Sequence, residues 1–365
     1  MKVNYIHKLD NMKYISKEKL EKLKEVSKKY KFRSNEYYLS LIDWKDENDP
    51  IRKIIIPQYS ELDEWGIEDA SKEYSYTISK GLQHKYKDTV LLLINDLCGG
   101  FCRFCFRKRL FINIGDEVTR DITTDLRYIE ENKEITNVLL TGGDPLLLST
   151  KKLNDIIKKL RDIDHIKIIR IGTKLPAFYP FRIIEDETLH SLIQNYSTPE
   201  KRLYFMLHIN HPNEITHYTI KSIDILLKNG AQVVNQTPIL KGINDDVKTL
   251  KKLFQKLSYI GVPPYYVFQN RPVMGNKPFA LEVEKGYINF LKALEEISGL
   301  AKRPKFVMSH ETGKIEISGI TKDKIMFKYH RANKEENKNK FMIYKRNPRA
   351  FWFDDYEYLL EEYKY

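Results

Sequence analysis

All three cysteines of the chain lie in one short stretch, NDLCGGFCRFCFRKR, at residues 95–109. Cys98, Cys102 and Cys105 are spaced CxxxCxxC, and the two glycines between the first pair let the backbone wrap closely around a bound group. Three thiolates on one loop can hold three irons of a four-iron cluster and leave the fourth iron open. Three unrelated buried thiols are one alternative. A zinc ion is another, and it would need a distant histidine as fourth ligand. The spacing favours the cluster.

The composition is that of a globular chain of 365 residues, 42% of them hydrophobic and 12% aromatic. The absence of cysteines elsewhere excludes a disulfide framework and fits a reducing, cytoplasmic location. No apolar run reaches the roughly 18 residues of a membrane helix, and no secretory signal is visible, so we expect neither a membrane span nor secretion. The net charge is +12, but lysine and glutamate alternate in the charged segments. Such alternation is typical of solvated helix faces and not of a nucleic-acid interface.

Six apolar runs, separated by amphipathic segments at a spacing of roughly 30 residues, indicate parallel strands covered by helices. STKKLNDIIKKLRDI is predicted as a helix capped by Ser149 or Thr150, and DDVKTLKKLFQKLSYIG as one that Gly261 ends. Polar residues follow the strands at their carboxyl ends, where β/α barrels build their chemistry. This favours an α/β fold with a partial (β/α)6 TIM-like barrel over a doubly wound sheet. The expected strands are 90–97, 136–143, 166–173, 202–210, 231–240 and 264–270.

The two ends of the chain differ in pattern from this middle part. Residues 1–88 are expected to form a mostly helical region, with a helix over KEKLEKLKEVSKKY and a loop over the proline-flanked NDPIRKIIIPQ. Residues 89–298 form the predicted barrel. Residues 299–365 are predicted as an α+β extension, with strands in KFVMS, ETGKIEISG and KIMFKYHRA and a terminal helix in WFDDYEYLLEEYKY.

A second motif connects the cysteines to a known superfamily. LLTGGDPLLL ends the second predicted strand with Gly142, Gly143 and Asp144, one β/α unit after the cysteine loop. Together the two motifs resemble the radical S-adenosylmethionine (SAM) enzymes, whose cysteine loop binds a [4Fe-4S] cluster and whose GGE-type motif holds the methionine amine. The resemblance implies that SAM binds the open iron. It also implies that an electron donor such as flavodoxin or ferredoxin reduces the cluster, which then cleaves SAM to a 5′-deoxyadenosyl radical.

Segments along nearly the whole chain resemble the lysine 2,3-aminomutase family, which moves an amino group between adjacent carbons with this radical and pyridoxal phosphate (PLP). They include YYLSLIDWKDENDPIRKIIIPQ, LHINHPNEIT, VVNQTPILKGINDD and PPYYVFQNRP. The resemblance implies that Phe104 lies near the adenine and that His208 and Gln236 contact SAM. It implies that Lys314 carries PLP and that Arg107 binds the substrate carboxylate, for which a planar guanidinium is suited. The alternatives are that Lys314 lies on a solvated turn and that Arg107 belongs to a solvated basic turn.

Three departures from the family pattern concern cofactor, substrate and zinc. Near the cofactor phosphate, where the family tends to carry two arginines, the chain has Lys85 and Thr89. Where lysine enzymes place acids against the terminal ammonium, it has Arg271 and Ser309. A desolvated arginine beside an ammonium group is unfavourable, so Arg271 favours a substrate with an acidic side chain, unless it pairs with an acid on a loop. Asp246 replaces a cysteine of the family's structural zinc site, which predicts no zinc.

The sequence therefore predicts a radical SAM, PLP-dependent amino-acid 2,3-aminomutase, an isomerase acting on a small acidic, glutamate-like amino acid. A PLP-independent radical SAM enzyme that modifies another small molecule, a peptide or a protein side chain is the alternative, because most of the family's glycines are missing around Lys314 and an arginine is missing near the phosphate. A non-enzymatic iron–sulfur or nucleic-acid-binding protein is the third hypothesis. We expect no nucleic-acid or membrane partner, and the sequence leaves a homo-oligomer open.

Overall fold

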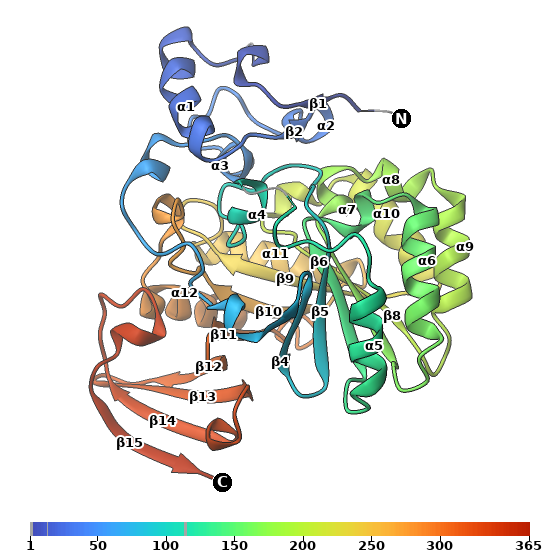
Figure 1. The fold of residues 1–365 in the computed structure, drawn as a ribbon. Coiled ribbons are helices and arrows are strands. Elements are labelled where there is room, and N and C mark those ends of the chain that lie inside the picture. The colour runs from blue at the N-terminus through green and yellow to red at the C-terminus, as the bar shows by residue number, and fades with distance from the viewer. Residues whose placement is uncertain (1–2, 13, 113–114) are drawn as a thin grey trace.

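A sheet of 13 strands runs through the protein, and its strands lie side by side in chain order from β3 to β15 (Figure 1). The structure, a computed structural model, describes residues 3–12, 14–112 and 115–365. Seven consecutive strands of the sheet are parallel, and the six strands predicted from apolar runs are confirmed among them. They are β5 (Thr89–Asn95), β6 (Asn137–Gly142), β7 (Ile168–Thr173), β8 (Leu203–Leu207), β9 (Gln232–Ile239), β10 (Pro264–Gln269) and β11 (Lys305–His310).

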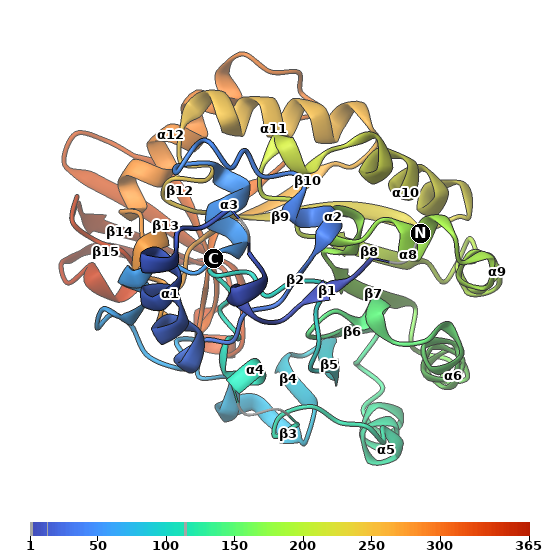
Figure 2. The same cartoon turned by 90° about the horizontal axis from the view of Figure 1, so that it is seen from above.

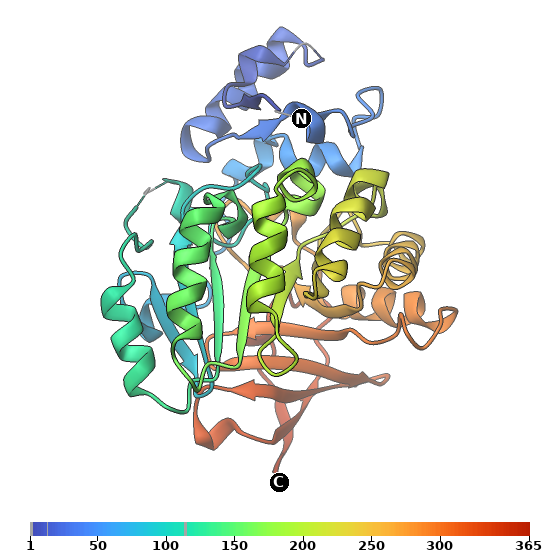
Figure 3. The same ribbon diagram turned by 90° about the vertical axis from the view of Figure 1, so that its right-hand side faces the viewer.

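Helices between these strands form an arc along one face of the sheet (Figures 2 and 3). Ser149 caps α6 by accepting a hydrogen bond from the Lys152 amide at 3.3 Å, as the sequence predicts. Asp246 caps α11 by accepting from the Thr249 amide at 2.9 Å. Side-chain burial alternates along the strands. In β9 every second side chain is buried on the helix side, and the others face the opposite, more open side. The helices are α5 (Thr123–Glu131), α6 (Thr150–Arg161), α7 (Leu175–Phe178), α8 (Phe181–Ile184), α9 (Glu187–Tyr196), α10 (His217–Lys228), α11 (Val247–Tyr259) and α12 (Val283–Glu295).

The α/β class predicted from the sequence is confirmed. Within the described residues the sheet is open, because β3 pairs only with β4 and β15 only with β14. The partial barrel of six units stays a prediction. β4 pairs with β5 and β10 pairs with β11, so one sheet continues across both predicted domain boundaries.

Antiparallel strands extend the sheet at both edges. The terminal helix predicted in WFDDYEYLLEEYKY is wrong: its end forms β15, which pairs with β14. Tyrosine-rich segments favour strands, and β14 offers this tail a partner for pairing. The extension is therefore β rather than α+β over its described residues, with only short 3-10 helices at Glu335–Asn337 and Phe353–Asp355. The edge strands are β3 (Thr77–Ser79), β4 (Leu82–Tyr86), β12 (Gly313–Ile320), β13 (Lys324–Ala332), β14 (Lys340–Lys345) and β15 (Leu359–Lys364).

The N-terminal region lies at the end of the molecule opposite to β12–β15 (Figures 1 and 3). The loop predicted in NDPIRKIIIPQ is wrong, because α3 forms there. Asp49 caps this helix by accepting from the Arg52 amide at 2.7 Å, and Pro50 is its first residue, a position that tolerates proline. The region comprises β1 (Tyr5–Ile6), β2 (Ser34–Asn35), α1 (Lys17–Lys29), α2 (Glu36–Leu39), α3 (Pro50–Ile55) and 3-10 helices at Leu9–Asn11, Tyr59–Leu62 and Glu73–Tyr76.

Four short segments complete the described elements: α4 (Arg109–Ile112) and 3-10 helices at Pro145–Leu147, Pro212–Glu214 and Lys277–Phe279. None of the helices in the described part of the chain combines the length and the apolar character that crossing a membrane requires.

Candidate active site

The cysteine loop connects β5 to α4 and brings its three thiols into one partly buried place. Burial raises the pKa of the Cys98 thiol well above its usual value, and the charges of Asp144, Cys105 and Cys102 act in the same direction. Burial also raises the pKa of Cys105, and that of Cys102 to about 12. The thiols are therefore protonated in the apo protein, and binding a cluster as thiolates must release protons.

The three thiols are suited to a cluster of several irons. Among the described residues, no group of three His, Cys, Asp or Glu side chains lies close enough to hold a single metal ion. A four-iron cluster requires no such convergence, because each thiolate binds a different iron. The residues present therefore fit the cluster that their spacing predicts.

Backbone contacts fasten the cysteine loop to the N-terminal region. The Arg33 side chain donates to the Cys98 carbonyl at 2.8 Å, and the Arg103 amide donates to the Ile54 carbonyl at 2.8 Å. A Cβ atom on Gly99 would lie 2.8 Å from the Leu175 side chain, and one on Gly100 3.0 Å from Ile55. The two glycines are thus required by packing between α3 and α7, a reason that the sequence alone does not reveal.

A buried ion pair anchors the middle of the loop. The Arg103 guanidinium donates to both Glu61 carboxylate oxygens, with its Nη2 atom 2.7 Å from Oε2, and both side chains are almost completely buried. We expect Glu61→Gln to lower the free energy of unfolding by about 3 kcal/mol, because it leaves a buried guanidinium without a counter-charge. Thermal or denaturant unfolding of the apo protein measures this effect.

Glu47→Gln is the matched control, because Glu47 pairs with Lys19 at 2.7 Å on the surface and is 74% exposed. Its expected loss is below about 1 kcal/mol. Equal losses from the two variants would contradict an anchoring role for the Arg103–Glu61 pair.

The Gly-Gly-Asp turn after β6 lies directly against the start of the cysteine loop. Gly142 has a φ of +107°, and a Cβ atom there would lie 2.4 Å from the Asn95 carbonyl oxygen. The Gly143 amide donates to that carbonyl at 2.5 Å, and the Asp144 amide donates to the Leu97 carbonyl at 2.7 Å. Both glycines are therefore needed where the two loops meet.

The Asp144 carboxylate is occupied by its own surroundings. It accepts hydrogen bonds from the Thr173 hydroxyl at 2.9 Å and from the Lys174 and Leu146 amides at 2.8 and 3.1 Å. Burial raises its pKa to about 6. Asp144 thus ties the loops after β6 and β7 together, beside the cysteines.

Two unpartnered polar side chains face the same open side of the sheet. His208 follows β8, and burial lowers its pKa to about 4, with the charges of Lys174 and Arg107 acting in the same direction, so the imidazole is neutral. Gln236 lies within β9 on the side away from the helices. Hydrogen bonds to either side chain are absent within the described residues, so both groups are available to a ligand. The Phe104 ring is buried and packs edge-on against Phe279 at 6.0 Å.

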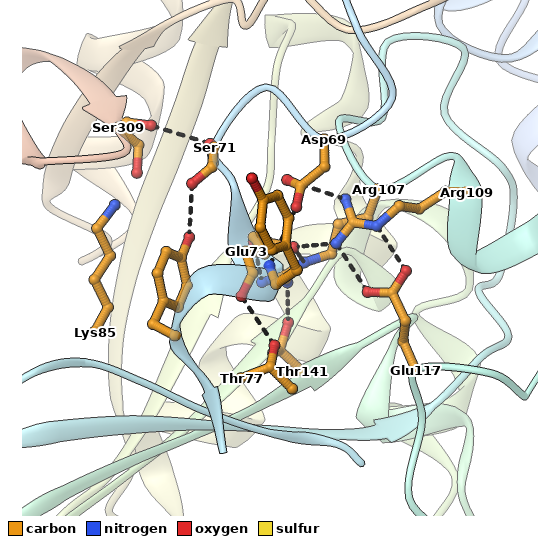
Figure 4. Close-up of polar contacts among 12 residues, drawn as sticks. Asp69, Ser71, Glu73, Thr77, Lys85, Arg107, Arg109, Glu117, Thr141 and Ser309 are labelled. Atoms are coloured by element: carbon orange, nitrogen blue, oxygen red, sulfur yellow. Dashed lines mark hydrogen bonds and ion pairs between the residues drawn. The ribbon is translucent and has the colours of Figure 1, made fainter. Parts of the chain in front are cut away.

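Arg107 is held by Glu73, a residue that the sequence analysis did not identify (Figure 4). Arg107 Nη2 lies 2.9 Å from Glu73 Oε1, its Nε lies 3.2 Å from Oε2, and Nη1 donates to the Thr141 hydroxyl at 3.2 Å. Burial opposes ionisation of Glu73, but Arg107 and Arg109 hold the pKa of that carboxyl well below its usual value. Glu73 thus fixes the Nε–Nη2 edge of the Arg107 guanidinium, while Nη1 contacts the neutral Thr141 hydroxyl.

Arg271 follows β10 and lies near Arg107. Its guanidinium lies 3.9 Å from the centre of the Phe106 ring, and within the described residues it makes no ion pair. Burial lowers the pKa of Arg271, and the nearby charge of Glu73 opposes this effect. Ser309 lies on β11, where its carbonyl accepts from the Ser71 hydroxyl at 3.2 Å.

Lys314 lies on β12 rather than in a loop, and its side chain is partly buried. Its Nζ atom is 4.0 Å from the centre of the Tyr266 ring and 5.3 Å from that of Phe268. Burial lowers the pKa of Lys314 well below its usual value, and surrounding arginines add to the effect. Lys85 on β4 donates to the His310 carbonyl, and burial lowers its pKa to about 7. A pKa of about 7 leaves much of the Lys85 amine uncharged near neutral pH, and burial shifts Lys314 in the same direction, toward the form in which an amine is nucleophilic.

Comparison with known proteins identifies relatives along the whole chain. Residues 92–254, which hold both motifs, His208 and Gln236, match the family described as the Radical SAM superfamily. The chain is 53% identical over 365 residues to a protein of Aquifex aeolicus provisionally named an L-lysine 2,3-aminomutase, and covers 97% of it. It is 37% identical over 306 residues to the L-lysine 2,3-aminomutase of Clostridium subterminale, a match spanning 82% of this chain and 72% of that protein. It is also 33% identical over 290 residues to the glutamate 2,3-aminomutase of Clostridioides difficile, spanning 78% and 66%.

Proposed function

We propose, from the premise that the chain belongs to the lysine 2,3-aminomutase family of radical SAM enzymes, that it moves the amino group of an acidic amino acid between carbons 2 and 3 with the help of PLP. The protein is a radical SAM isomerase with a [4Fe-4S] cluster and SAM as cofactors. Like other radical SAM enzymes it takes electrons from an external donor, for which we propose a flavodoxin or ferredoxin.

In this proposal each cofactor has its own residues on the open face of the sheet. The cluster and SAM supply the radical that starts the reaction, and PLP supplies the electron system through which the amino group shifts. Lys314 would hold PLP, because its amine borders the Tyr266 ring and burial favours the uncharged, nucleophilic form of that amine. Cys98, Cys102 and Cys105 would hold the cluster. The residues assigned to SAM are Phe104, Gly142, Gly143, Asp144, His208 and Gln236.

The observation that carries the acidic substrate is the pair of arginines, Arg107 and Arg271. Arg107 would bind the carboxylate next to the amine, and Glu73 holds the Nε–Nη2 edge of its guanidinium. Arg271 has no ion pair within the described residues, although a guanidinium taken out of water needs an anionic partner. A second carboxylate on the substrate would supply that partner, whereas the ammonium group of lysine would be repelled. The similarity to a glutamate 2,3-aminomutase agrees with this assignment.

A panel of substrates tests the proposal. Reconstituted, reduced enzyme is incubated with glutamate, aspartate, glutamine and lysine, and β-amino products are identified by mass spectrometry. We expect products from the acidic amino acids. Arg271→Gln should reduce kcat/KM for them by about 10- to 100-fold, the effect of losing a charge-assisted contact. Arg303→Gln, on the exposed surface, is the control that should leave kcat/KM unchanged. A product from lysine and none from the acids would contradict the role of Arg271.

A PLP-independent radical enzyme is the second candidate. It is favoured by Lys85, whose amine donates to the His310 carbonyl instead of pointing at an open anion site. Titration of the wild-type protein with PLP decides between the aminomutase and this second candidate, because a PLP-independent enzyme should not bind PLP.

A further inference from the structure

Four cations surround the Lys314 amine, and within the described residues only one of them, Arg331, forms an ion pair. The charges that act on it most strongly are, in decreasing order, those of Arg170, Arg331, Arg271 and Lys85, and no carboxylate is among them. Like charges gathered away from bulk water repel one another and are stable only with an anion among them. The described chain supplies few such anions: Glu73 is shared by Arg107 and Arg109, and Asp88 pairs with Arg331.

Arg170 is the first of two cations that the sequence analysis did not identify. It lies in β7, within the otherwise apolar run of that strand, and its Nε donates to the Asn137 side chain at 2.9 Å. No ion pair to Arg170 exists within the described residues. Burial lowers the pKa of Arg170 and the charge of Arg331 acts in the same direction, whereas Tyr265, Tyr266 and, less strongly, Asp88 oppose the effect.

Arg331 is the second such cation, and it stands directly opposite Lys314 across the β12–β13 pair. Side chains of directly opposed residues point to the same face of a sheet, so Arg331 and Lys314 share the open face. The guanidinium lies 4.2 Å from the centre of the Tyr86 ring, and its Nη2 is 3.3 Å from the Thr89 hydroxyl. Nη2 also donates to the Asp88 carboxylate, which is 56% exposed.

The strand geometry next to Arg331 is irregular in a way that affects its direction. Lys314 pairs with Arg331, but the next residue, Ile315, pairs with Tyr329, so His330 is an extra residue in β13. Such a bulge twists a strand and re-aims the adjacent side chains, and bulges are frequent next to active sites. Arg331 is thereby placed between the lysine strand and the start of β5, where Thr89 lies.

We infer that Arg331 and Arg170 bind the phosphate group of the PLP carried by Lys314, an inference that rests on the proposed function. In PLP the aldehyde carbon and the phosphate-bearing carbon are attached to adjacent ring atoms, so the phosphate must lie close to the lysine. Two guanidinium forks match a phosphate dianion in charge and in hydrogen-bond geometry. Thr89 stands where the family tends to carry an arginine near the phosphate. Arg331, from the C-terminal part of the chain, thus supplies the positive charge that Thr89 lacks.

Titration of anaerobically purified protein with PLP, pyridoxal and inorganic phosphate tests this inference, with the absorbance of the bound cofactor as readout. We expect Arg331→Met to weaken PLP binding about 10- to 100-fold and to leave pyridoxal binding unchanged, because pyridoxal has no phosphate. Arg170→Met should act in the same direction. Arg331→Lys should restore part of the affinity, and inorganic phosphate should compete with PLP in the wild-type protein. Arg349→Met is the matched control, an exposed arginine without a side-chain contact to the described residues.

Asp88→Asn is expected to change PLP affinity in the opposite direction to Arg331→Met. The Asp88 carboxylate pairs with Arg331 and so competes with a phosphate, and its removal should tighten PLP binding. A purely structural role for Arg331 predicts no such gain.

The outcomes separate this inference from the proposed function. Wild-type PLP affinity in the Arg331→Met and Arg170→Met proteins would overturn the phosphate assignment and leave PLP dependence standing. A wild-type protein that binds neither PLP nor pyridoxal would overturn both. Binding of inorganic phosphate without binding of PLP would show that the site takes a free or substrate phosphate, and would also overturn the assignment to the cofactor.

Discussion

Cys102→Ser is expected to abolish cleavage of SAM and to leave purified, reconstituted protein without its [4Fe-4S] cluster. Each of the three thiolates would hold a different iron, so the loss of one leaves two irons without a protein ligand. Serine is nearly the same size as cysteine, and its hydroxyl oxygen is a hard, weak ligand for iron–sulfur clusters. Cys98→Ser and Cys105→Ser should have the same effect.

Three measurements check this expectation: iron and sulfide content, the visible absorbance of the cluster, and formation of 5′-deoxyadenosine by the reduced protein. The chain has no cysteine outside the loop, so no other thiol can substitute. Thermal unfolding of the apo variants should match that of the wild type, because the thiol is buried in its neutral form and a neutral hydroxyl replaces it. Zinc in place of iron in the wild-type protein, or SAM cleavage by the serine variants, would contradict the cluster assignment.

Lys314→Met is expected to reduce aminomutase activity by about 1,000-fold or more while leaving reduction and cleavage of SAM in place. The amine is the only group of that side chain that can form a covalent bond with PLP, and methionine keeps most of the volume beside Tyr266. The absorbance band of lysine-bound PLP should disappear from the purified protein. Lys324→Met, at the surface of β13 in a pair with Glu361, is the matched control and should retain both.

The same variant should also change stability in a defined direction. Because burial lowers the pKa of Lys314 in the folded state, the native protein binds the lysine proton less tightly than the unfolded chain does, and this destabilises the apo protein at pH values below the ordinary pKa of lysine. Removal of the amine should therefore stabilise the apo protein, and the stability of the wild type should rise relative to that of Lys314→Met as pH increases. If the PLP band persists in Lys314→Met and disappears in Lys85→Met, Lys85 is the lysine that carries the cofactor.

The sequence predicts those features that depend on local spacing. The six parallel strands follow from apolar runs, the cap of α6 from Ser149, and the cluster loop from CxxxCxxC. The wrong predictions arose where local patterns are ambiguous. Pro50 begins α3 because Asp49 precedes it as a cap, and the tyrosine-rich tail forms β15 because a partner strand is available.

The residues missed in the site are those whose role depends on strand register or on distant contacts. Nothing near Glu73 in the sequence shows that it lies beside Arg107, 34 residues further along the chain. Arg331 faces the open side only through its register with Lys314 and the bulge at His330. Arg170 alone left a local signal, as a charged residue inside the apolar run IKIIRIGT.

The order of the strands along the chain has a consequence for biosynthesis. The Arg331–Thr89 contact joins residues 242 positions apart, so the PLP end of the site is completed only when β13 docks near β5. Contacts of such long range form late, because a long loop must first be closed. The cysteine loop and the Gly-Gly-Asp turn, by contrast, are made from residues 95–144 and leave the ribosome much earlier. A chain that ends before β12 would thus carry the cysteine loop and the Gly-Gly-Asp turn without Lys314 and Arg331. Pairing of β12 with β13 is therefore the folding step that completes the proposed PLP site.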